Sequence, residues 1–344
     1  MLKSGKGLVN VGVIGCGYWG PNLIRNFCEV VESKVIACSD VNPLRLNYIK
    51  QRFPFLELYS DYKDILNNSN IDAVSIATPV STHFKIAKEA LLAGKHVLVE
   101  KPMTTSSKEA EELIETARNS KKVLMVGHTF EYSGAVNKIK DIINSGEIGD
   151  IYYFDSNRVN LGLFQKDINV AWDLAPHDIS IMLYVMNLKP LQVSAFGKAY
   201  INKNIEDILY IFLNFPKNII AHIHVSWLAP VKYRRTVIGG SKKMVVYDDV
   251  ENIEKIKIFD RGVVVTDVDS STGIFDRQLY YRTGDIMSPK IDTTESLHVE
   301  CSHFIDCIIN NKKPRSDGES GLWVIKILEA AQNSLRNESK PVKI

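Results

Sequence analysis

The chain has 344 residues, of which 42 are lysine or arginine and 40 are aspartate or glutamate, so its formal net charge is only +2. At about 150 residues per domain this length predicts two domains, and the near-neutral charge argues against nucleic acid or an anionic membrane as a partner. Five cysteines without a C-x-x-C pair argue against a disulfide framework or zinc ribbon and favour a reducing, cytoplasmic location. The opening MLKSGKGLVN lacks the apolar segment of a signal peptide, and no apolar run approaches the roughly 20 residues of a membrane span.

The first part of the chain alternates short apolar runs with helical segments. Strands are predicted at 9–14, 35–40, 57–59, 71–79, 96–100 and 123–128, with helices near 20–32, 43–52, 61–67, 81–93 and 106–120. This repeated order of strand and helix is typical of a doubly wound parallel sheet. Residues 1–128 are therefore predicted to form an α/β domain.

The pattern changes after residue 128. Helices are expected near 133–145 and 174–187, strands at 151–159, 191–200, 206–215, 219–228, 233–239, 243–248 and 254–259, and two closing helices near 294–310 and 319–335. Consecutive strands separated by turns are typical of an antiparallel sheet. Residues 129–344 are therefore predicted to be an α+β domain, in which 261–292 forms a long loop.

A glycine-rich turn follows the first predicted strand. Residues 15–20 read Gly-Cys-Gly-Tyr-Trp-Gly, a G-x-G-x-x-G pattern. Gly15 permits a tight turn, Gly17 lets the backbone approach a pyrophosphate, and Gly20 lets the following helix pack closely on the sheet. The helix N-terminus would bind the pyrophosphate through its free N–H groups. The pattern predicts a dinucleotide site; the alternative is a glycine turn that binds no cofactor.

Asp40 ends the second predicted strand, 20 residues after Gly20. Its carboxylate can accept hydrogen bonds from both ribose hydroxyls and would repel a 2′-phosphate, so NAD is favoured over NADP. Arg45 instead favours NADP, because its guanidinium could reach a 2′-phosphate. In the alternative without a cofactor, Asp40 only caps the helix that begins near residue 43.

Three later segments follow predicted strands, at the edge of the sheet where doubly wound domains bind ligands. They are Ala77-Thr78-Pro79 with His83, Glu100-Lys101-Pro102, and Gly127-His128. Because Pro102 drives the preceding residue towards an extended conformation, Lys101 is expected to point out of the sheet edge into a cleft. The alternative is an ordinary solvated lysine in a turn.

The second domain contributes Trp172-Asp173-Leu174-Ala175-Pro176-His177-Asp178. Since proline is tolerated in the first turn of a helix, Asp173 is expected just before or at a helix start and His177 within the first turn. The helix dipole disfavours a charged histidine there, so His177 would stay neutral and able to accept a proton. Asp173 would orient the ring or join the hydrogen bonds of a substrate hydroxyl. The alternative is a capping aspartate beside a hydrogen-bonded core histidine.

Two further groups of polar residues lie on predicted strands. His222 and His224 share a face, but no third ligand lies at a suitable spacing, so they are interpreted as packing or surface residues and no metal site is predicted. In Lys232-Tyr233-Arg234-Arg235, strand alternation puts Arg234 and Arg235 on opposite faces. One of the two arginines could meet an anionic substrate; a solvated sheet edge is the alternative.

Together, these motifs resemble the glucose–fructose oxidoreductase / inositol dehydrogenase family (Gfo/Idh/MocA). The matching segments are GVIGCGYWG at 12–20, IATPVSTH at 76–83, VEKPM at 99–103, the Asp173-x-x-x-His177 pair and SDGESGLWVIKILEAA at 316–331. The resemblance implies an α/β Rossmann domain followed by an α+β domain whose large, mostly antiparallel open sheet often mediates oligomers, so a homodimer or homotetramer is expected. It also implies a tightly held nicotinamide cofactor and a sugar or cyclitol substrate.

The resemblance also implies site residues. Lys101 corresponds to the family's lysine in E-K-P, and Asp173 and His177 correspond to its D-x-x-x-H pair, although Ala175 stands where the family commonly has glycine. The residues expected at the cofactor are Gly15, Gly17, Tyr18, Trp19, Gly20, Asp40, Thr78, Pro79, His83, Glu100 and Lys101. Those expected at the substrate are Lys101, His128, Trp172, Asp173, His177 and Arg234.

Within the family, WDLAPHD and KYRRTVIGG are similar to members that act on nucleotide-activated sugars, including UDP-N-acetylglucosaminuronate 3-dehydrogenases of surface-polysaccharide synthesis. The hypothesis is hydride transfer between a sugar ring carbon, C3 in that case, and C4 of the nicotinamide. His177 would accept the hydroxyl proton, and Lys101 would stabilise the charge that develops on the oxygen; exchanged roles are open.

Other activities are compatible with the same motifs. An inositol or free-sugar dehydrogenase is one alternative, and an NAD-dependent glycosidase that oxidises and then re-reduces its sugar is another. A protein that binds the cofactor without redox chemistry is disfavoured, because a mere binder needs none of Lys101, Asp173 and His177.

Overall fold

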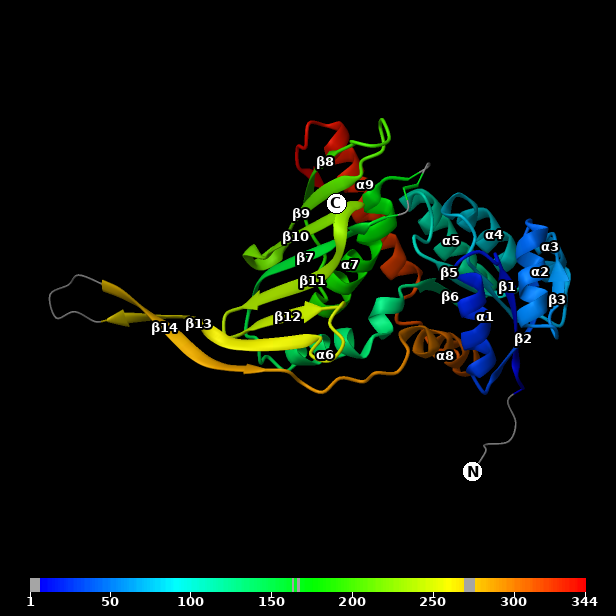
Figure 1. The fold of residues 1–344 in the computed structure, drawn as a ribbon, viewed down its shortest axis with the longest axis horizontal. Coiled ribbons are helices and arrows are strands. Elements are labelled where there is room, and N and C mark those ends of the chain that lie inside the picture. Colours follow the sequence, from blue (N-terminus) through cyan, green and yellow to red (C-terminus); the bar gives the residue numbers. More distant parts are fainter. Residues whose placement is uncertain (1–6, 163, 166–167, 269–275) are drawn as a thin grey trace, which may run out of the picture. The chain divides into compact units, whose positions relative to one another are not determined.

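The computed structural model describes residues 7–162, 164–165, 168–268 and 276–344, and these form two compact units (Figure 1). The first unit comprises the described residues up to Ser133 together with Thr293–Glu329, and the second comprises Gly134–Asp292 with Ala330–Ile344. This division differs from the predicted split at residue 128. The segment Thr293–Glu329, expected in the second domain, packs with the first unit because its apolar side chains complete the core of that unit.

A parallel sheet organises the described residues of the first unit. Its six strands lie in the order β3-β2-β1-β4-β5-β6. They are β1 (Val9–Ile14), β2 (Ser33–Ser39), β3 (Glu57–Tyr59), β4 (Ala73–Ile76), β5 (His96–Glu100) and β6 (Leu124–Gly127), and the connecting helices are α1 (Gly20–Glu29), α2 (Pro43–Arg52), α3 (Tyr62–Asn67), α4 (Val80–Leu92) and α5 (Ser107–Ser120). Every pair in this sheet is parallel, so the predicted doubly wound fold is confirmed.

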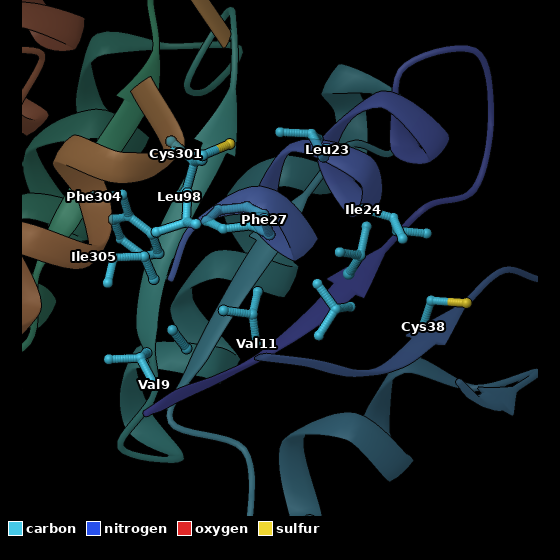
Figure 2. Packing of buried hydrophobic residues seen from close by; sticks show 14 of the residues in the cluster. Val9, Val11, Leu23, Ile24, Phe27, Cys38, Leu98, Cys301, Phe304 and Ile305 are labelled. Atoms are coloured by element: carbon cyan, nitrogen blue, oxygen red, sulfur yellow. The ribbon is translucent and has the colours of Figure 1, made fainter. Parts of the chain in front are cut away.

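Two helices from the end of the chain close this unit. They are α8 (Ser296–Asn310) and, up to Glu329, α9 (Gly318–Arg336), with the short 3₁₀ helix η1 (Thr129–Tyr132) near α8. Figure 2 shows Phe304 and Cys301 of α8 packed with Phe27 of α1 and Leu98 of β5, and the two phenyl rings meet edge to face at 6.2 Å. Burying these rings anchors α8 on the sheet.

A broad, mostly antiparallel sheet organises the second unit. Within the described residues its nine strands lie in the order β14-β13-β12-β11-β7-β10-β9-β8-β15, and only β7 and β10 pair in parallel. They are β7 (Ile151–Leu161), β8 (Gln192–Lys198), β9 (Ile208–Asn214), β10 (Ile220–Ser226), β11 (Leu228–Gly240), β12 (Met244–Asp248), β13 (Ile256–Val268), β14 (Asp276–Met287) and β15 (Val342–Lys343). The other elements are α6 (Gly134–Asn144), α7 (Val170–Met186) and the 3₁₀ helix η2 (Pro216–Asn218). The predicted α+β class is confirmed.

The prediction of a long loop over 261–292 is wrong. Most of this segment belongs to a hairpin of β13 and β14, which Figure 1 shows continuing beyond the rest of the sheet. Its apolar residues come in consecutive runs, so both faces carry exposed side chains such as Val263, Val264 and Tyr281. Consecutive exposed apolar residues lack the alternation by which strands are recognised.

No helix in the described ranges is long and apolar enough to cross a membrane.

Candidate functional site

The glycine turn between β1 and α1 lies where the order of the parallel strands reverses, because β1 is flanked by β2 and β4. Gly15 has φ +95°, and a Cβ there would lie 2.6 Å from the carbonyl oxygen of Ala77, which follows β4. A Cβ on Gly20 would collide with the carbonyl oxygen of Gly15. Packing within the protein therefore demands glycine at both positions.

Gly17 has a different reason to be glycine. The nearest atoms to a Cβ at this position are those of the Arg45 guanidinium, at 3.7 Å and 3.8 Å, so the folded chain itself does not exclude a side chain. The space beside its backbone opens at the N-terminus of α1, where free N–H groups and the helix dipole favour an anion. The turn thus fits the pyrophosphate of a dinucleotide, and a bound NAD would supply a hydride acceptor at its nicotinamide.

Asp40 lies directly after β2 and is only 7% exposed. Its Oδ2 accepts a hydrogen bond from the N–H of Cys16 in the glycine turn, and its Oδ1 accepts one from the N–H of Asn42, both at 2.8 Å. Asn42, not Asp40, caps α2, because its side chain accepts from the N–H of Leu44. The alternative in which Asp40 only caps this helix is therefore wrong.

Arg45 lies beside the same carboxylate, with its Nη1 3.4 Å from Oδ2 of Asp40. Each carboxylate oxygen can accept more than one hydrogen bond, so Asp40 keeps the capacity to bind ribose hydroxyls while its charge is held in place. Tyr18 and Trp19 of the turn stack with ring centroids 6.3 Å apart, and Tyr18 is almost fully exposed.

The loops after β4 and β5 are joined by His83. Its ring lies within 2.8 Å of the carbonyl oxygen of Pro102 through Nδ1 and of Thr78 through Nε2. Burial is the main influence on this ring and lowers its pKa, against the opposing effect of the two carbonyls. A neutral ring has one N–H and donates to one of the two carbonyls, while the other nitrogen lies against the second. Because the buried ring contacts both loops, we interpret His83 as the residue that orders the Thr78-Pro79 turn and the Lys101-Pro102 loop rather than as a direct cofactor ligand.

Glu100, Lys101 and His128 lie at the ends of β5 and β6. The backbone of Gly127 abuts Glu100, since a Cβ on Gly127 would lie 2.9 Å from Oε2 of that carboxyl. His128 is 1% exposed, and burial, followed by the charge of Lys101, lowers its pKa to about 3. A neutral ring enclosed in this way does not fit the predicted role in substrate binding.

Helix α7 of the second unit begins earlier than predicted. Asn169 caps it by accepting from the N–H groups of Ala171 and Trp172, so Asp173 lies in the first turn and His177 lies a full turn further in. The argument that the dipole at the first turn keeps His177 neutral is therefore wrong, because this effect fades beyond the first turn. Asp173 and His177 are four residues apart and share one face of the helix.

A buried indole of the second unit holds Asp173 in place, and a proline lies one turn nearer the centre of α7. Trp227, which is fully buried between β10 and β11, donates from Nε1 to Oδ2 of Asp173 at 2.9 Å. Pro176 lies inside α7 and has no N–H to offer the carbonyl of Trp172. Trp227 was not identified from sequence; its only signal is an indole at a strand end, where a buried N–H must find an acceptor.

A buried ion pair fixes α7 to the sheet. Arg158 of β7 bonds through Nε to Asp178, the residue after His177, and both side chains are 3% exposed. Ser156 donates to the other oxygen of Asp178 at 2.7 Å and also contacts Thr236 of β11. Removing one partner of such a pair would leave an uncompensated buried charge, so α7 has little freedom to turn on the sheet.

Arg234 lies opposite Arg158 in the pairing of β11 with β7, so the two share the face of the sheet that α7 covers. Its Nη1 lies 3.2 Å from Oδ2 of Asp249. Arg235 pairs opposite Asn157 and points to the other face. Because β11 is flanked by β12 and β7, the alternative of a sheet edge at these arginines is wrong.

The two strand histidines lie on that other face, which we call the outer face and define by Phe196, Tyr210, Phe212, His222 and His224. Tyr210 stacks on His224 at 4.3 Å and on His222 at 5.8 Å, and His222 also contacts Asp155. In the part of the chain that the structure describes, no cluster of three metal-ligating side chains is present.

Comparisons with known proteins agree with this geometry. Residues 9–128 match a family model described as "Oxidoreductase family, NAD-binding Rossmann fold", and residues 136–246 match the "GFO/IDH/MocA C-terminal domain". The chain belongs to the Gfo/Idh/MocA family. It is accordingly an NAD-binding oxidoreductase of a family that acts on CH–OH groups, and the predicted cofactor, NAD, is confirmed.

Relatives within the family differ in substrate. The chain is 24% identical to myo-inositol 2-dehydrogenase of Thermotoga maritima, over 98% of each chain. It is 26% identical to UDP-N-acetylglucosamine 3-dehydrogenase of Acidithiobacillus ferrooxidans, over 92% of this chain and 94% of that protein. The structure of levoglucosan dehydrogenase with NADH and levoglucosan shares the fold with a TM-score of 0.83 and 20% identity, over 98% of this chain and 99% of that one.

The contrast between Gly17 and Gly15 yields a prediction. Gly17→Val is expected to fold normally and to lower NAD affinity by about tenfold or more, because its side chain would occupy the space beside the pyrophosphate. Gly15→Ala is the matched control and should lose roughly 1–3 kcal/mol of stability, because φ is positive and backbone is in the way. Calorimetric titration with NAD and thermal unfolding of both variants measure the two effects. Undiminished NAD binding by Gly17→Val would contradict the placement of the pyrophosphate beside the backbone of Gly17.

Proposed function

We propose that this protein is a dehydrogenase that transfers a hydride between a sugar ring carbon and NAD, and that its substrate is a nucleotide-activated sugar. The observation that best supports a dehydrogenase activity is the Asp173–His177 pair on one face of α7, in which Asp173 is oriented by the buried Trp227. A binding protein would need no such fixed acid–base pair. The relative named as a UDP-N-acetylglucosamine 3-dehydrogenase supports the substrate class.

We propose that His177 accepts the proton of the substrate hydroxyl. Oxidation of an alcohol requires removal of that proton as the hydride leaves, and a histidine on the same helix face as a carboxylate can accept it. Lys101, placed at the carboxyl end of β5, donates to the same oxygen and stabilises its developing negative charge. Asp173 orients the substrate hydroxyl and the imidazole ring of His177 by hydrogen bonding.

Removing either group should slow turnover strongly but leave the cofactor bound. We expect His177→Ala and Lys101→Ala each to lower kcat by about 10²–10⁴-fold, the contribution typical of general acid–base groups. The absorbance of NADH formed from a panel of nucleotide sugars, free sugars and inositols measures this. Lys108→Ala, an exposed lysine at the start of α5, is the control and should behave as wild type. Near-wild-type turnover in either active-site variant, with NAD still bound, would remove that residue from the mechanism.

The proposal that the substrate is a nucleotide-activated sugar rests on Arg234. A nucleotide diphosphate carries negative charge that an inositol or free sugar lacks, and Arg234 brings a guanidinium to the face of the sheet covered by α7. Its ion pair with Asp249 holds the guanidinium in place, and the side chain is 25% exposed. A charge-assisted bond to a diphosphate is among the stronger polar contacts in proteins.

Comparing the two neighbouring arginines tests this substrate class. Arg234→Ala is expected to weaken binding of a UDP-sugar by about tenfold or more, as is typical when a charge-assisted contact is lost. Arg235→Ala, on the outer face, should bind as wild type does. Calorimetric titration of the NAD-loaded variants with UDP-N-acetylglucosamine provides the measurement. Equal affinity in both variants would favour the inositol or free-sugar alternative.

We also propose a homo-oligomer formed through the outer face. Phe196 and Phe212 meet edge to face there, and both are about half exposed, at 51% and 45%. Exposed aromatic side chains on one face of an open sheet are typical of surfaces that pack against another protein. A second copy of this chain offers the same apolar surface, as an isologous dimer requires.

A charge at the centre of the outer face should dissociate the oligomer. Phe212→Asp is expected to halve the molar mass measured by light scattering after gel filtration, because an unpaired carboxylate would be buried between the copies. Tyr200→Ser, which alters an exposed side chain beyond β8, is the control and should leave the mass unchanged. A wild-type mass equal to one chain would overturn the proposal.

A further inference from the structure

Trp227 is held through both its backbone and its ring. It lies between β10 and β11 with 0% exposure. Its N–H donates to the carbonyl oxygen of Asp207 at 2.9 Å, and its own carbonyl accepts from the N–H of Gly162 at 3.0 Å. Phe164 meets the indole edge to face, with ring centroids 5.6 Å apart. The indole therefore has a single place in the packed interior of this unit.

Gly162, which directly follows β7, makes that place possible. A Cβ on Gly162 would collide with Cδ1 of Trp227, the ring atom bonded to Nε1. The φ angle of Gly162 lies outside the left-handed region, so the backbone conformation alone does not demand glycine. The indole demands it, and it does so at the edge of the ring that carries the N–H.

The turn before β9 holds both Trp227 and the start of α7. Two consecutive carbonyls do this: that of Glu206 accepts from the N–H of Val170, the first residue of α7, and that of Asp207 accepts from Trp227. The carboxylate of Asp207 is itself buried and accepts from the backbone N–H groups of Tyr200 and Ile201. The position of the indole is thus fixed against the first turn of α7.

The acceptor of the indole N–H is a side chain of the candidate site. Nε1 of Trp227 lies 2.9 Å from Oδ2 of Asp173, which is partly exposed, as is His177 on the same helix face. Burial alone requires only some acceptor for the indole, and a backbone carbonyl would serve. A carboxylate gives a charge-assisted bond, which is stronger and fixes the orientation of the acceptor.

We propose that Trp227 and Gly162 are positioning residues of the active site. Gly162 gives the indole its place, and the indole N–H sets the orientation of the Asp173 carboxylate beside His177. This inference rests on the proposed function, in which Asp173 orients the hydroxyl and the imidazole. Groups that react must be held closely in position by the residues around them. A tryptophan that only stabilised the fold would affect turnover equally with and without Asp173.

A double-mutant cycle separates these two roles. Trp227→Phe keeps an aromatic ring in the core but removes the N–H, and we expect it to lower kcat by about 10–100-fold. In an Asp173→Ala background the same change should lower kcat by less than about twofold, because the bond is already absent. Trp323→Phe, which alters a partly exposed tryptophan on α9, is the control and should behave as wild type. An equal loss in both backgrounds would overturn the positioning role.

Gly162→Ala tests the same bond with every side chain of the site intact. It should displace the indole and lower kcat by about tenfold or more, and this loss should also disappear in the Asp173→Ala background. Gly262→Ala is the matched control, because the nearest atom to a Cβ on this strand glycine is 3.4 Å away. Turnover by Gly162→Ala equal to that of Gly262→Ala would remove Gly162 from the proposal.

Nuclear magnetic resonance of the indole N–H groups needs no turnover. The chain has four tryptophans, and the signal missing from ¹⁵N-tryptophan-labelled, NAD-loaded Trp227→Phe identifies Trp227. That signal should shift in Asp173→Ala and in Gly162→Ala but not in Gly262→Ala. An unmoved signal in Asp173→Ala would overturn the proposal. Failure of the proposed function would instead appear as no turnover with any sugar while the indole signal still responds to Asp173.

Discussion

The close approach of the turn after β1 to the turn after β4 is the constraint on which the first unit depends. A Cβ on Gly15 would overlap the backbone of Ala77, so two parallel strands can lie side by side here only if glycine begins the turn. In the same turn, the nearest atoms to a Cβ on Gly17 would be those of the Arg45 guanidinium, so its backbone stays open to a ligand. The place where strand order reverses thereby becomes an anion site, and Asp40 is held beside it by the amide of Cys16.

In the second unit, α7 carries polar side chains although it packs on an apolar sheet. Two of them, Asp173 and Asp178, are held by buried polar partners. The Arg158–Asp178 pair fixes the helix to β7, and the Trp227 indole fixes the carboxylate of Asp173. Both contacts are made by groups whose burial would be costly if they were unpaired, so the orientation of the Asp173–His177 face is determined by packing rather than by helix propensity.

Burial also decides which ionisable groups carry charge. His128 and Glu300 are enclosed to the same degree, and the low polarity around them favours the neutral form of each, so the pKa of the histidine falls and that of the carboxyl rises. At the end of β5, burial raises the pKa of Glu100 to about 7, while the positive charge of Lys101 acts in the opposite direction.

Local patterns in the sequence determined the parallel sheet, the glycine turn with Asp40 and the D-x-x-x-H pair, because each depends on residues close together in the chain and on the periodicity of apolar side chains. Tertiary structure decided the rest. The described side chains of the β13–β14 hairpin at Val263, Val264 and Leu279–Tyr281 are exposed and give no alternating pattern, and α7 begins early because Asn169 caps it. Trp227 reaches Asp173 across 54 positions, and Thr129 donates to Glu300 across 171. Contacts between segments so far apart are set by how helices and strands pack, which no local pattern records.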